Sequence, residues 1–279
     1  MDVAISELNK TANTIRQDII EIAYKAGGPS HPGPALSCAD ILTALYFSIM
    51  KIAPENPTWE LRDRFILSKG HACPVLYATL ARKGYFPYEW LYSLRRLDSH
   101  LQGHPDMKKT PGIDMTSGSL GCGLSAGLGM AYYLKLAKTQ SKVFVVLGDG
   151  ELQEGAVWEA AMSASALKLN NLIAIIDSNR LQSCGAVEDI ISQNRIKEVW
   201  RGFGWNVLEI DGHNMEDILQ ALKESCDSKD TPTCIIAHTI KGKGVSFMEN
   251  NNDWHQKIPT KEEYEQAKNE LNAERATLL

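Results

Sequence analysis

The sequence predicts an α/β fold with a mostly parallel sheet that is covered by helices on both faces. Five short segments are rich in β-branched residues and show almost no alternation of apolar and polar residues, namely RFILS, KVFVVLG, NLIAIID, WNVLEID and TCIIAHT. Such runs are typical of strands that are buried on both faces. Helical patterns lie between several of these segments, so right-handed βαβ connections are expected.

The helices are predicted from apolar residues at helical spacing. The segment ISELNKTANTIRQDIIEIAYKAG has this spacing, and Gly27 and Gly28 are expected to end its helix. A second helix is expected from Ser37. Further helical patterns cover residues 120–138, 151–169 and 214–223, and a charged amphipathic helix is expected over about 260–279.

The chain has 279 residues, of which 44% are hydrophobic, so it can build one large domain or two smaller ones. No internal repeat or linker interrupts residues 1–250, and we therefore expect a single domain over residues 1–279. This domain includes the C-terminal helix.

Composition argues against several classes of protein. The formal net charge is −5 and no run of Lys or Arg is present, so nucleic acid is not an expected partner. The six cysteines have neither metal-site spacing nor the density of a disulfide scaffold, and reduced thiols are expected. No stretch approaches the eighteen or so apolar residues that cross a bilayer, and the N-terminus does not have the pattern of a signal peptide. The expected location is the cytoplasm, without a membrane partner.

Polar side chains follow two neighbouring predicted strands. Gly148, Asp149 and Gly150 follow one strand, and Asn179 lies just after the next. Because ligands of doubly wound sheets bind at the carboxyl ends of the strands, we expect these residues to meet there. One carboxylate and one amide oxygen favour Mg²⁺ or Ca²⁺ over zinc, and so few ligands suggest that a diphosphate completes the site. A helix starting near Glu151 is expected to direct backbone N–H groups at the anion.

Either cluster alone is more often a turn or a cap, but the joint pattern is specific. A strand, Gly-Asp-Gly, a helix, a strand and Asn at this spacing resemble the thiamin diphosphate motif. The resemblance extends over nearly the whole chain to the N-terminal, diphosphate-binding part of transketolase. It rests on SHPGPALS, ILSKGHACPVLYA, QGHPD, TSGSLGCGLSAGLGMA, GDGELQEGAVWEAAM, DSNRLQ, IDGHN, AHTIKGKGVSFMEN and DWHQKIPT, which occur in the order expected of that family.

This resemblance implies the six-stranded parallel sheet of thiamin diphosphate enzymes. It also implies that Asp149, Asn179 and the backbone oxygen of Leu181 hold Mg²⁺, with Ca²⁺ as a possible substitute. Gly150 is then expected to meet the cofactor diphosphate. Glu154 matches a family glutamate that lies near the cofactor and the dimer interface.

Four histidines lie in irregular segments marked by glycine or proline: His31, His71, His104 and His255. Any one of them alone is more often a turn residue, but imidazoles also bond phosphate oxygens and sugar hydroxyls and move protons near neutral pH. By resemblance, His71 and His255 contact the diphosphate or the substrate, and His31 and His104 line the channel to the reactive carbon of the cofactor. We therefore expect His31, His104 and His255 to be catalytic, and His71 and His255 to bind the cofactor. Of the other histidines, His213 and His238 are expected to be structural, and His100 has no assigned role.

The TSGSLGCG loop is expected to bring Gly118, Ser119 and Leu120 close to the cofactor, although the same pattern also fits a simple helix entry. The chain departs from many full-length transketolases here, because Ser119 replaces proline and Cys122 replaces glutamine. Ser30 likewise replaces the common glycine before His-Pro-Gly. These changes leave the cofactor clamp intact and leave the substrate open.

A full-length transketolase continues into a pyrimidine-binding domain, whose glutamate activates the cofactor, and then into a C-terminal domain. The resemblance therefore implies the N-terminal subunit of a split transketolase. It would transfer a two-carbon ketol unit from a ketose phosphate to an aldose with a separate C-terminal subunit, in an assembly of two copies of each. The alternatives are the diphosphate-binding subunit of a decarboxylase, of a 2-oxo acid dehydrogenase or of a deoxyxylulose phosphate synthase type, and a non-catalytic binding module. The ketose itself stays open between pentose phosphates, branched sugar phosphates and sulfonated sugars.

Overall fold

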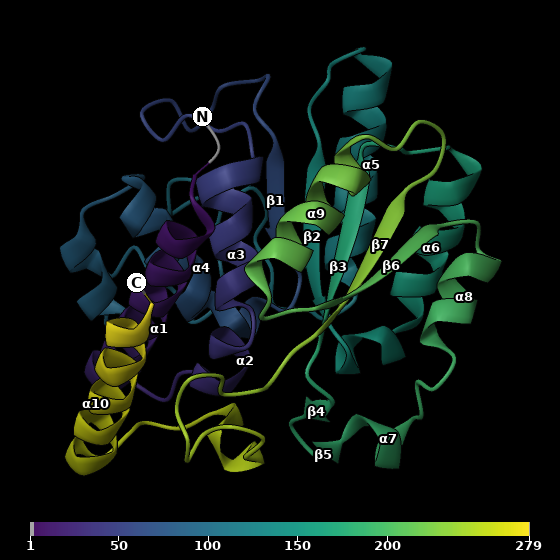
Figure 1. Cartoon of the computed structure of the whole chain (residues 1–279). Helices are drawn as coiled ribbons and strands as arrows, with labels where there is room; N and C mark the ends of the chain where they lie inside the picture. Colours follow the sequence, from purple (N-terminus) through teal and green to yellow (C-terminus); the bar gives the residue numbers. More distant parts are fainter. Residues whose placement is uncertain (1–2, 279) are drawn as a thin grey trace.

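A five-stranded parallel sheet forms the centre of the molecule in the computed structural model, which describes residues 3–278. The strands follow the order β1-β2-β3-β7-β6 across the sheet (Figure 1). All five segments predicted as strands form this sheet, with the bounds β1 Arg64–Leu67, β2 Val143–Gly148, β3 Leu172–Ser178, β6 Asn206–Asp211 and β7 Thr233–His238. The α/β fold with a parallel sheet is therefore confirmed.

Successive side chains of a strand point alternately into two apolar layers, which explains why the strand sequences are apolar almost without interruption. In β2, Phe144 and Val146 belong to one hydrophobic cluster, whereas Val145 and Leu147 belong to the other. Because both faces are covered, neither face needs polar residues. The first face is covered by α1 Ile5–Lys25, α3 Ala39–Ala44, α4 Cys73–Lys83 and α9 Met215–Cys226, and the second by α5 Cys122–Leu136, α6 Gly155–Ala166 and α8 Ile196–Gly202.

The remaining elements are short, except for the last helix. A π-helix covers Leu45–Ile49, and 3-10 turns cover Gly70–Ala72, Tyr88–Ser93, Gly150–Gln153 and Asn252–His255. The other elements are α2 Pro32–Leu36, β4 Leu181–Gln182, β5 Gly185–Ala186, α7 Val187–Ile190 and α10 Lys261–Thr277. The Thr260 side chain and Glu263 form a capping box at the start of α10. This helix packs along α1, where Tyr264 stacks on Tyr24 at a ring distance of 4.3 Å.

Three expectations about the fold were wrong. The sheet has five strands rather than six in residues 3–278, because no sixth β-branched segment is available and the remaining strand pair there is the short β4–β5 hairpin. The helix expected from Ser37 starts at Ala39 instead, because Ser37 is the C-cap of the short helix α2; its hydroxyl donates to Asp177 on the sheet at 2.6 Å. The helix expected from Glu151 starts at Gly155 instead, after a 3-10 turn.

Other expectations agree with the structure. All six cysteines are free thiols. Among residues 3–278, no helix combines the length and the apolar character needed to cross a membrane.

Candidate active site

The two polar clusters meet because β2 and β3 are neighbours in register. Gly148 at the end of β2 pairs with Asp177 near the end of β3. The loops that follow these two strands line a cavity of about 340 Å³ at the carboxyl edge of the sheet, which is the lower side in Figure 1. The lining includes most of the residues predicted for the site: His31, His71, Gly118, Leu120, Asp149, Gly150, Glu154, Asn179, Leu181 and His255.

Asp149 is buried and is held by two backbone N–H groups. Gly150 N donates to one carboxylate oxygen at 2.8 Å, and Arg180 N donates to the other at 2.5 Å. Burial, together with the nearby carboxylate of Asp177, raises the pKa of Asp149 to about 6. A bound cation would offset both effects, because it favours the charged carboxylate.

The other two predicted metal ligands have hydrogen bonds of their own close to Asp149. The Asn179 side chain donates to Asp177 at 3.0 Å and accepts from Leu181 N at 3.1 Å. Leu181 O accepts from the Lys241 ammonium at 3.3 Å. Residues 3–278 hold no group of three or more His, Cys, Asp or Glu side chains placed to bind a metal. A metal at Asp149 therefore needs amide, backbone and ligand oxygens, which is the donor chemistry of Mg²⁺.

Lys69, which sequence reasoning missed, lines the cavity and forms a buried ion pair with Asp177. Burial opposes the charge of Lys69, but the Asp177 carboxylate more than compensates and raises the lysine pKa. Lys69 also donates to Pro34 O at 2.9 Å, just ahead of the second predicted helix. This ion pair fixes the end of β3 against α2. In the sequence, the one indication of it is a lysine directly after a predicted strand.

Three histidines surround one side of the cavity. The ring of His31 lies 5.2 Å from that of His71 and 5.5 Å from that of His255, and His71 and His255 are 5.2 Å apart. Burial and, after it, the charge of His255 lower the pKa of His31 to about 3. Burial and then Lys69 hold the pKa of His71 well below its usual value. These imidazoles are therefore neutral at pH 7, and each keeps one N–H donor and one acceptor nitrogen.

Lys241 sets the tautomer of His255. The lysine ammonium, which can only donate, lies 3.0 Å from Nδ1 of His255. Nδ1 is then the acceptor and Nε2 carries the proton, free to donate to a phosphate oxygen or a hydroxyl. Burial lowers the pKa of Lys241 to about 8 and, with Lys241 as the next cause, that of His255 to about 4. Lys241 was not predicted, and its fully buried side chain in a glycine-rich loop gave no distinct sequence signal.

Two predicted residues, His104 and Ser119, do not line the cavity. His104 lies against Gly118, whose φ of 141° is rarely adopted by other residues; a β-carbon there would approach the His104 ring at 3.1 Å. His104 is therefore at the rim, next to the lining residue Gly118. Ser119 precedes α5 and contacts Cys122, with Oγ 3.7 Å from the thiol.

Glu151 was expected only as a helix start, yet its buried carboxylate joins three segments. It accepts from Gly121 N at 2.8 Å, from Gly148 N at 3.1 Å and from the Ser68 hydroxyl. Burial raises its pKa. Glu151 thus fastens the start of α5 to the ends of β1 and β2, which sets the position of Leu120 in the cavity.

The remaining histidines lie outside the cavity. Nε2 of His213 accepts from Ile240 N at 2.8 Å, so Nδ1 donates to Asp40 at 2.7 Å, which agrees with the predicted structural role. His238 is partly exposed and lies 3.5 Å from Glu209. His100 stacks on Trp90 at a ring distance of 4.1 Å.

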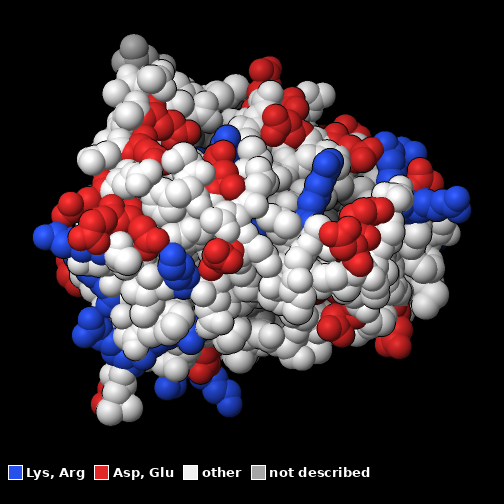
Figure 2. Space-filling model, turned by 90° about the horizontal axis from the view of Figure 1, so that it is seen from below, with Lys and Arg blue, Asp and Glu red and all other residues white. Residues whose placement is uncertain are grey.

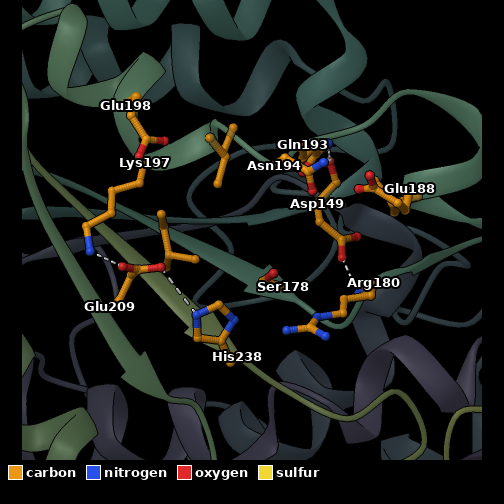
Figure 3. Close-up of a pocket in the computed structure, with 13 residues that line it drawn as sticks. Asp149, Ser178, Arg180, Glu188, Gln193, Asn194, Lys197, Glu198, Glu209 and His238 are labelled. Carbon is orange, nitrogen blue, oxygen red and sulfur yellow. Dashed lines mark hydrogen bonds and ion pairs between the residues drawn. The ribbon is translucent and has the colours of Figure 1, made fainter.

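A larger cavity of about 730 Å³ shares Asp149 with the first one. Figure 3 shows Lys197 and His238 both directed at Glu209 on its far wall, while Arg180 extends between Asp149 and His238. This cavity contains none of the four histidines predicted for the site. The candidate site is therefore the smaller cavity, where three of these histidines and the predicted metal ligands meet.

The carboxyl side of the sheet carries mixed charge. On the face in Figure 2, Lys and Arg side chains are interspersed with Asp and Glu, and much of the centre is uncharged. This surface has no continuous basic track of the kind that follows a nucleic-acid backbone.

Comparison with known proteins identifies the family. The family model described as "Transketolase, thiamine diphosphate binding domain" matches residues 7–277. The chain belongs to this transketolase family. An apulose-4-phosphate transketolase subunit from Phocaeicola vulgatus is 45% identical over 272 residues, which cover 98% of this chain and 95% of the relative. The 6-deoxy-6-sulfo-D-fructose transketolase subunit SqwG of a Clostridium species is 44% identical, with 97% of this chain and 98% of the relative covered.

Single-chain transketolases match only in part. Human transketolase is 40% identical over 268 residues, which cover 96% of this chain but 42% of the human protein. The crystal structure of transketolase from Campylobacter jejuni superimposes with a TM-score of 0.88 at 34% identity and covers 98% of this chain and 43% of that chain. The transketolase resemblance and the predicted fold are therefore confirmed, and the chain spans less than half of the single-chain transketolases.

Proposed function

We propose that this chain is the cofactor-binding subunit of a split transketolase, which transfers a two-carbon ketol unit from a ketose to an aldose. The observation that carries this proposal is the meeting of Asp149, Asn179 and Leu181 with His31, His71 and His255 in one cavity. A decarboxylase or a 2-oxo acid dehydrogenase subunit would not need this histidine set. A non-catalytic binding module would not need it either.

The cavity fits thiamin diphosphate and a divalent cation. Asp149 offers a buried carboxylate, and Nδ1 of His31 is a buried polar atom without a hydrogen-bond partner within residues 3–278. A β-carbon on Gly150 would lie 2.9 Å from the Gln182 side chain, so the packing of this lining residue requires glycine. We propose that Asp149, Asn179 and Leu181 O hold Mg²⁺, and that Ca²⁺ can replace it.

When bound, thiamin diphosphate supplies the carbanion chemistry at the substrate carbonyl. The residues of this chain bind and orient. His71 and the Nε2–H of His255 donate to diphosphate or sugar oxygens, since a neutral imidazole still keeps one N–H. His31 lines the cavity with an unpaired Nδ1 and moves or holds a proton on the sugar, and His104 acts from the rim.

Replacing the histidines is expected to separate positioning from chemistry. His71→Ala is expected to weaken cofactor binding about tenfold or more, because a hydrogen bond to a charged diphosphate is lost. His31→Ala and His104→Ala are expected to lower kcat about a hundredfold with cofactor affinity nearly unchanged. Calorimetric titration of the assembled enzyme with cofactor measures the affinity, and steady-state kinetics measure kcat. Weaker cofactor binding in His31→Ala and His104→Ala, with His71→Ala unaffected, would reverse these roles.

A separate partner subunit is proposed because the chain matches proteins named as transketolase subunits over nearly their whole length. It matches only part of single-chain transketolases.

The outer faces of α5 and α6 provide a surface for this partner subunit. These adjacent helices contain one charged residue each, Lys135 and Glu159. Their exposed apolar side chains are Tyr132, Tyr133, Leu136 and Met162. Both helices start beside the cavity, after the lining residues Leu120 and Glu154, so a body seated on them also reaches the site. We propose an assembly with two copies of each subunit, as symmetric closure favours.

Tyr133→Glu is expected to weaken association with the partner subunit by about thirtyfold, because a charge replaces a tyrosine that is 68% exposed on this helix pair. Ile5→Glu is the control, since Ile5 is also an exposed apolar helix residue, but on α1 at the other face of the sheet. Sedimentation of mixed subunits measures both variants. Unchanged association of Tyr133→Glu, or equal loss in Ile5→Glu, would remove α5 and α6 as the docking surface.

The substrates are proposed to be ketoses with an oxyanion at the end away from the carbonyl. The names of two relatives specify such sugars: apulose-4-phosphate carries a phosphate, and 6-deoxy-6-sulfo-D-fructose carries a sulfonate. Sugar phosphates are the first donors to test. Activity with none of the phosphate or sulfonate ketoses, in a complex that binds the cofactor, would contradict this substrate class.

A further inference from the structure

Arg95 is a partly buried arginine whose guanidinium has no hydrogen bond or ion pair within residues 3–278. The other arginines that are not exposed all have partners. Arg16 and Arg62 pair with aspartates, and Arg64 donates to backbone oxygens. The Arg95 nitrogens are not among the fully buried polar atoms that lack a partner within residues 3–278, so they reach solvent and are open to an anionic ligand.

The backbone holds Arg95 in this place against its own preference. Its φ is 61°, a left-handed conformation that non-glycine residues seldom adopt. Arg95 N donates to Leu101 O at 3.1 Å, which closes the loop that carries it.

Gly103 makes room for the Arg95 side chain, which lies between the two histidine segments. A β-carbon on Gly103 would lie 2.7 Å from the guanidinium carbon, so any larger residue before His104 would displace the guanidinium. A β-carbon on Gly28, three residues before His31, would lie 3.9 Å from Arg95 Cδ. Arg95 thus lies between the segments that lead to His31 and His104, and its charge is among the causes that lower the pKa of both.

Arg95 carries the positive charge in this region that no group within residues 3–278 engages, since the Lys241 ammonium is bonded to Leu181 O, Asn252 and His255. His31, His71 and His255 are neutral at pH 7, and the buried Lys69 is committed to Asp177. An oxyanion of the substrate therefore finds in Arg95 a free guanidinium, whose planar fork matches phosphate or sulfonate oxygens in a bidentate way.

We propose that Arg95 binds the terminal oxyanion, phosphate or sulfonate, of the ketose substrate and so contributes to substrate selection from this subunit. The inference rests on the proposed function, since it assumes that an anionic sugar enters the histidine-lined cavity. The main rival for the guanidinium is a carboxylate of the partner subunit, which is an outcome of the test below.

The test compares Arg95→Gln with wild type in the assembled two-subunit enzyme, using a ketose phosphate and the same ketose without its phosphate. We expect KM for the phosphorylated donor to rise ten- to a hundredfold with kcat within about threefold of wild type, because a charge-assisted hydrogen-bond pair is lost. For the neutral ketose, kcat/KM is expected to change by less than about threefold. Arg95→Lys keeps the charge but loses the planar guanidinium with its paired donors. We expect a smaller rise in KM, again only for the phosphorylated donor.

Arg96→Gln is the matched control. It removes a neighbouring arginine, which is exposed and donates to Lys25 O at 3.0 Å, and both KM values are expected to stay unchanged. Equal losses on both donors in Arg95→Gln would overturn the proposal. Weaker association of the two subunits with unchanged KM would assign the guanidinium to a partner carboxylate and would also overturn it.

A binding measurement separates this inference from the proposed function. Arabitol 5-phosphate is a sugar phosphate without a carbonyl, so it binds without reacting. We expect its affinity for the cofactor-loaded complex to fall about tenfold or more in Arg95→Gln and to stay unchanged in Arg96→Gln. If the complex shows no ketol transfer while this dependence on Arg95 is found, the proposed function fails and the oxyanion site stands. If transfer is found and Arg95→Gln binds the probe as tightly as wild type, only the oxyanion site fails.

Discussion

Asp149→Asn is expected to lower the affinity for thiamin diphosphate with Mg²⁺ by at least a hundredfold while the chain stays folded. The substitution keeps the shape of the side chain but removes the one carboxylate among the proposed metal ligands, and Mg²⁺ rarely binds in a protein without one. Folding is preserved because Asp149 lies at the carboxyl edge of the sheet, outside both hydrophobic clusters. Calorimetric titration of the cofactor in the presence of Mg²⁺, together with a thermal unfolding curve, measures the two effects.

Asp211→Asn is the control for this experiment. Asp211 also ends a strand of the same sheet, β6, but it does not line the cavity. Its carboxylate accepts a hydrogen bond from His213 N at 2.8 Å. Its replacement is expected to leave cofactor affinity within about twofold of wild type. Equal affinities in Asp149→Asn and wild type would remove Asp149 from the cofactor site.

The sheet was predictable from local sequence. Each of its five strands is a short run of β-branched residues with both faces apolar, so burial and strand propensity indicate the same structure. The neighbouring positions of β2 and β3 bring Asp149 and Asn179 together, which is why a pattern of residues only 30 apart located the cavity. The three cavity histidines followed from their glycine- and proline-marked segments and from the family resemblance.

The parts that escaped prediction depend on contacts between distant segments. Ser37 lies between α2 and α3, and its hydroxyl bonds Asp177, 140 residues away. Lys69 and Glu151 resemble ordinary surface residues in the sequence, yet both are buried by partners from other segments. Arg95 stands out only because the structure leaves its guanidinium unpaired beside two histidine segments.

The second large effect concerns the chain by itself. Residues 1–279 are expected to show no measurable ketol transfer, because the proposed activating glutamate and the rest of the substrate site belong to the partner subunit. The exposed apolar face of α5 and α6 is expected to make the isolated chain self-associate at high concentration. Weak cofactor binding is expected to persist, since the cavity with Asp149, His71 and His255 is formed by this chain alone.

The most direct measurement titrates this chain with its purified partner and follows ketol transfer from a ketose phosphate to an aldose. The account predicts that neither subunit is active by itself, and that activity rises to a plateau at an equimolar ratio. Mass measurement of the active species is expected to give two copies of each subunit. Full transketolase turnover by residues 1–279 without a partner, or no turnover at any ratio with the cofactor bound, would contradict it.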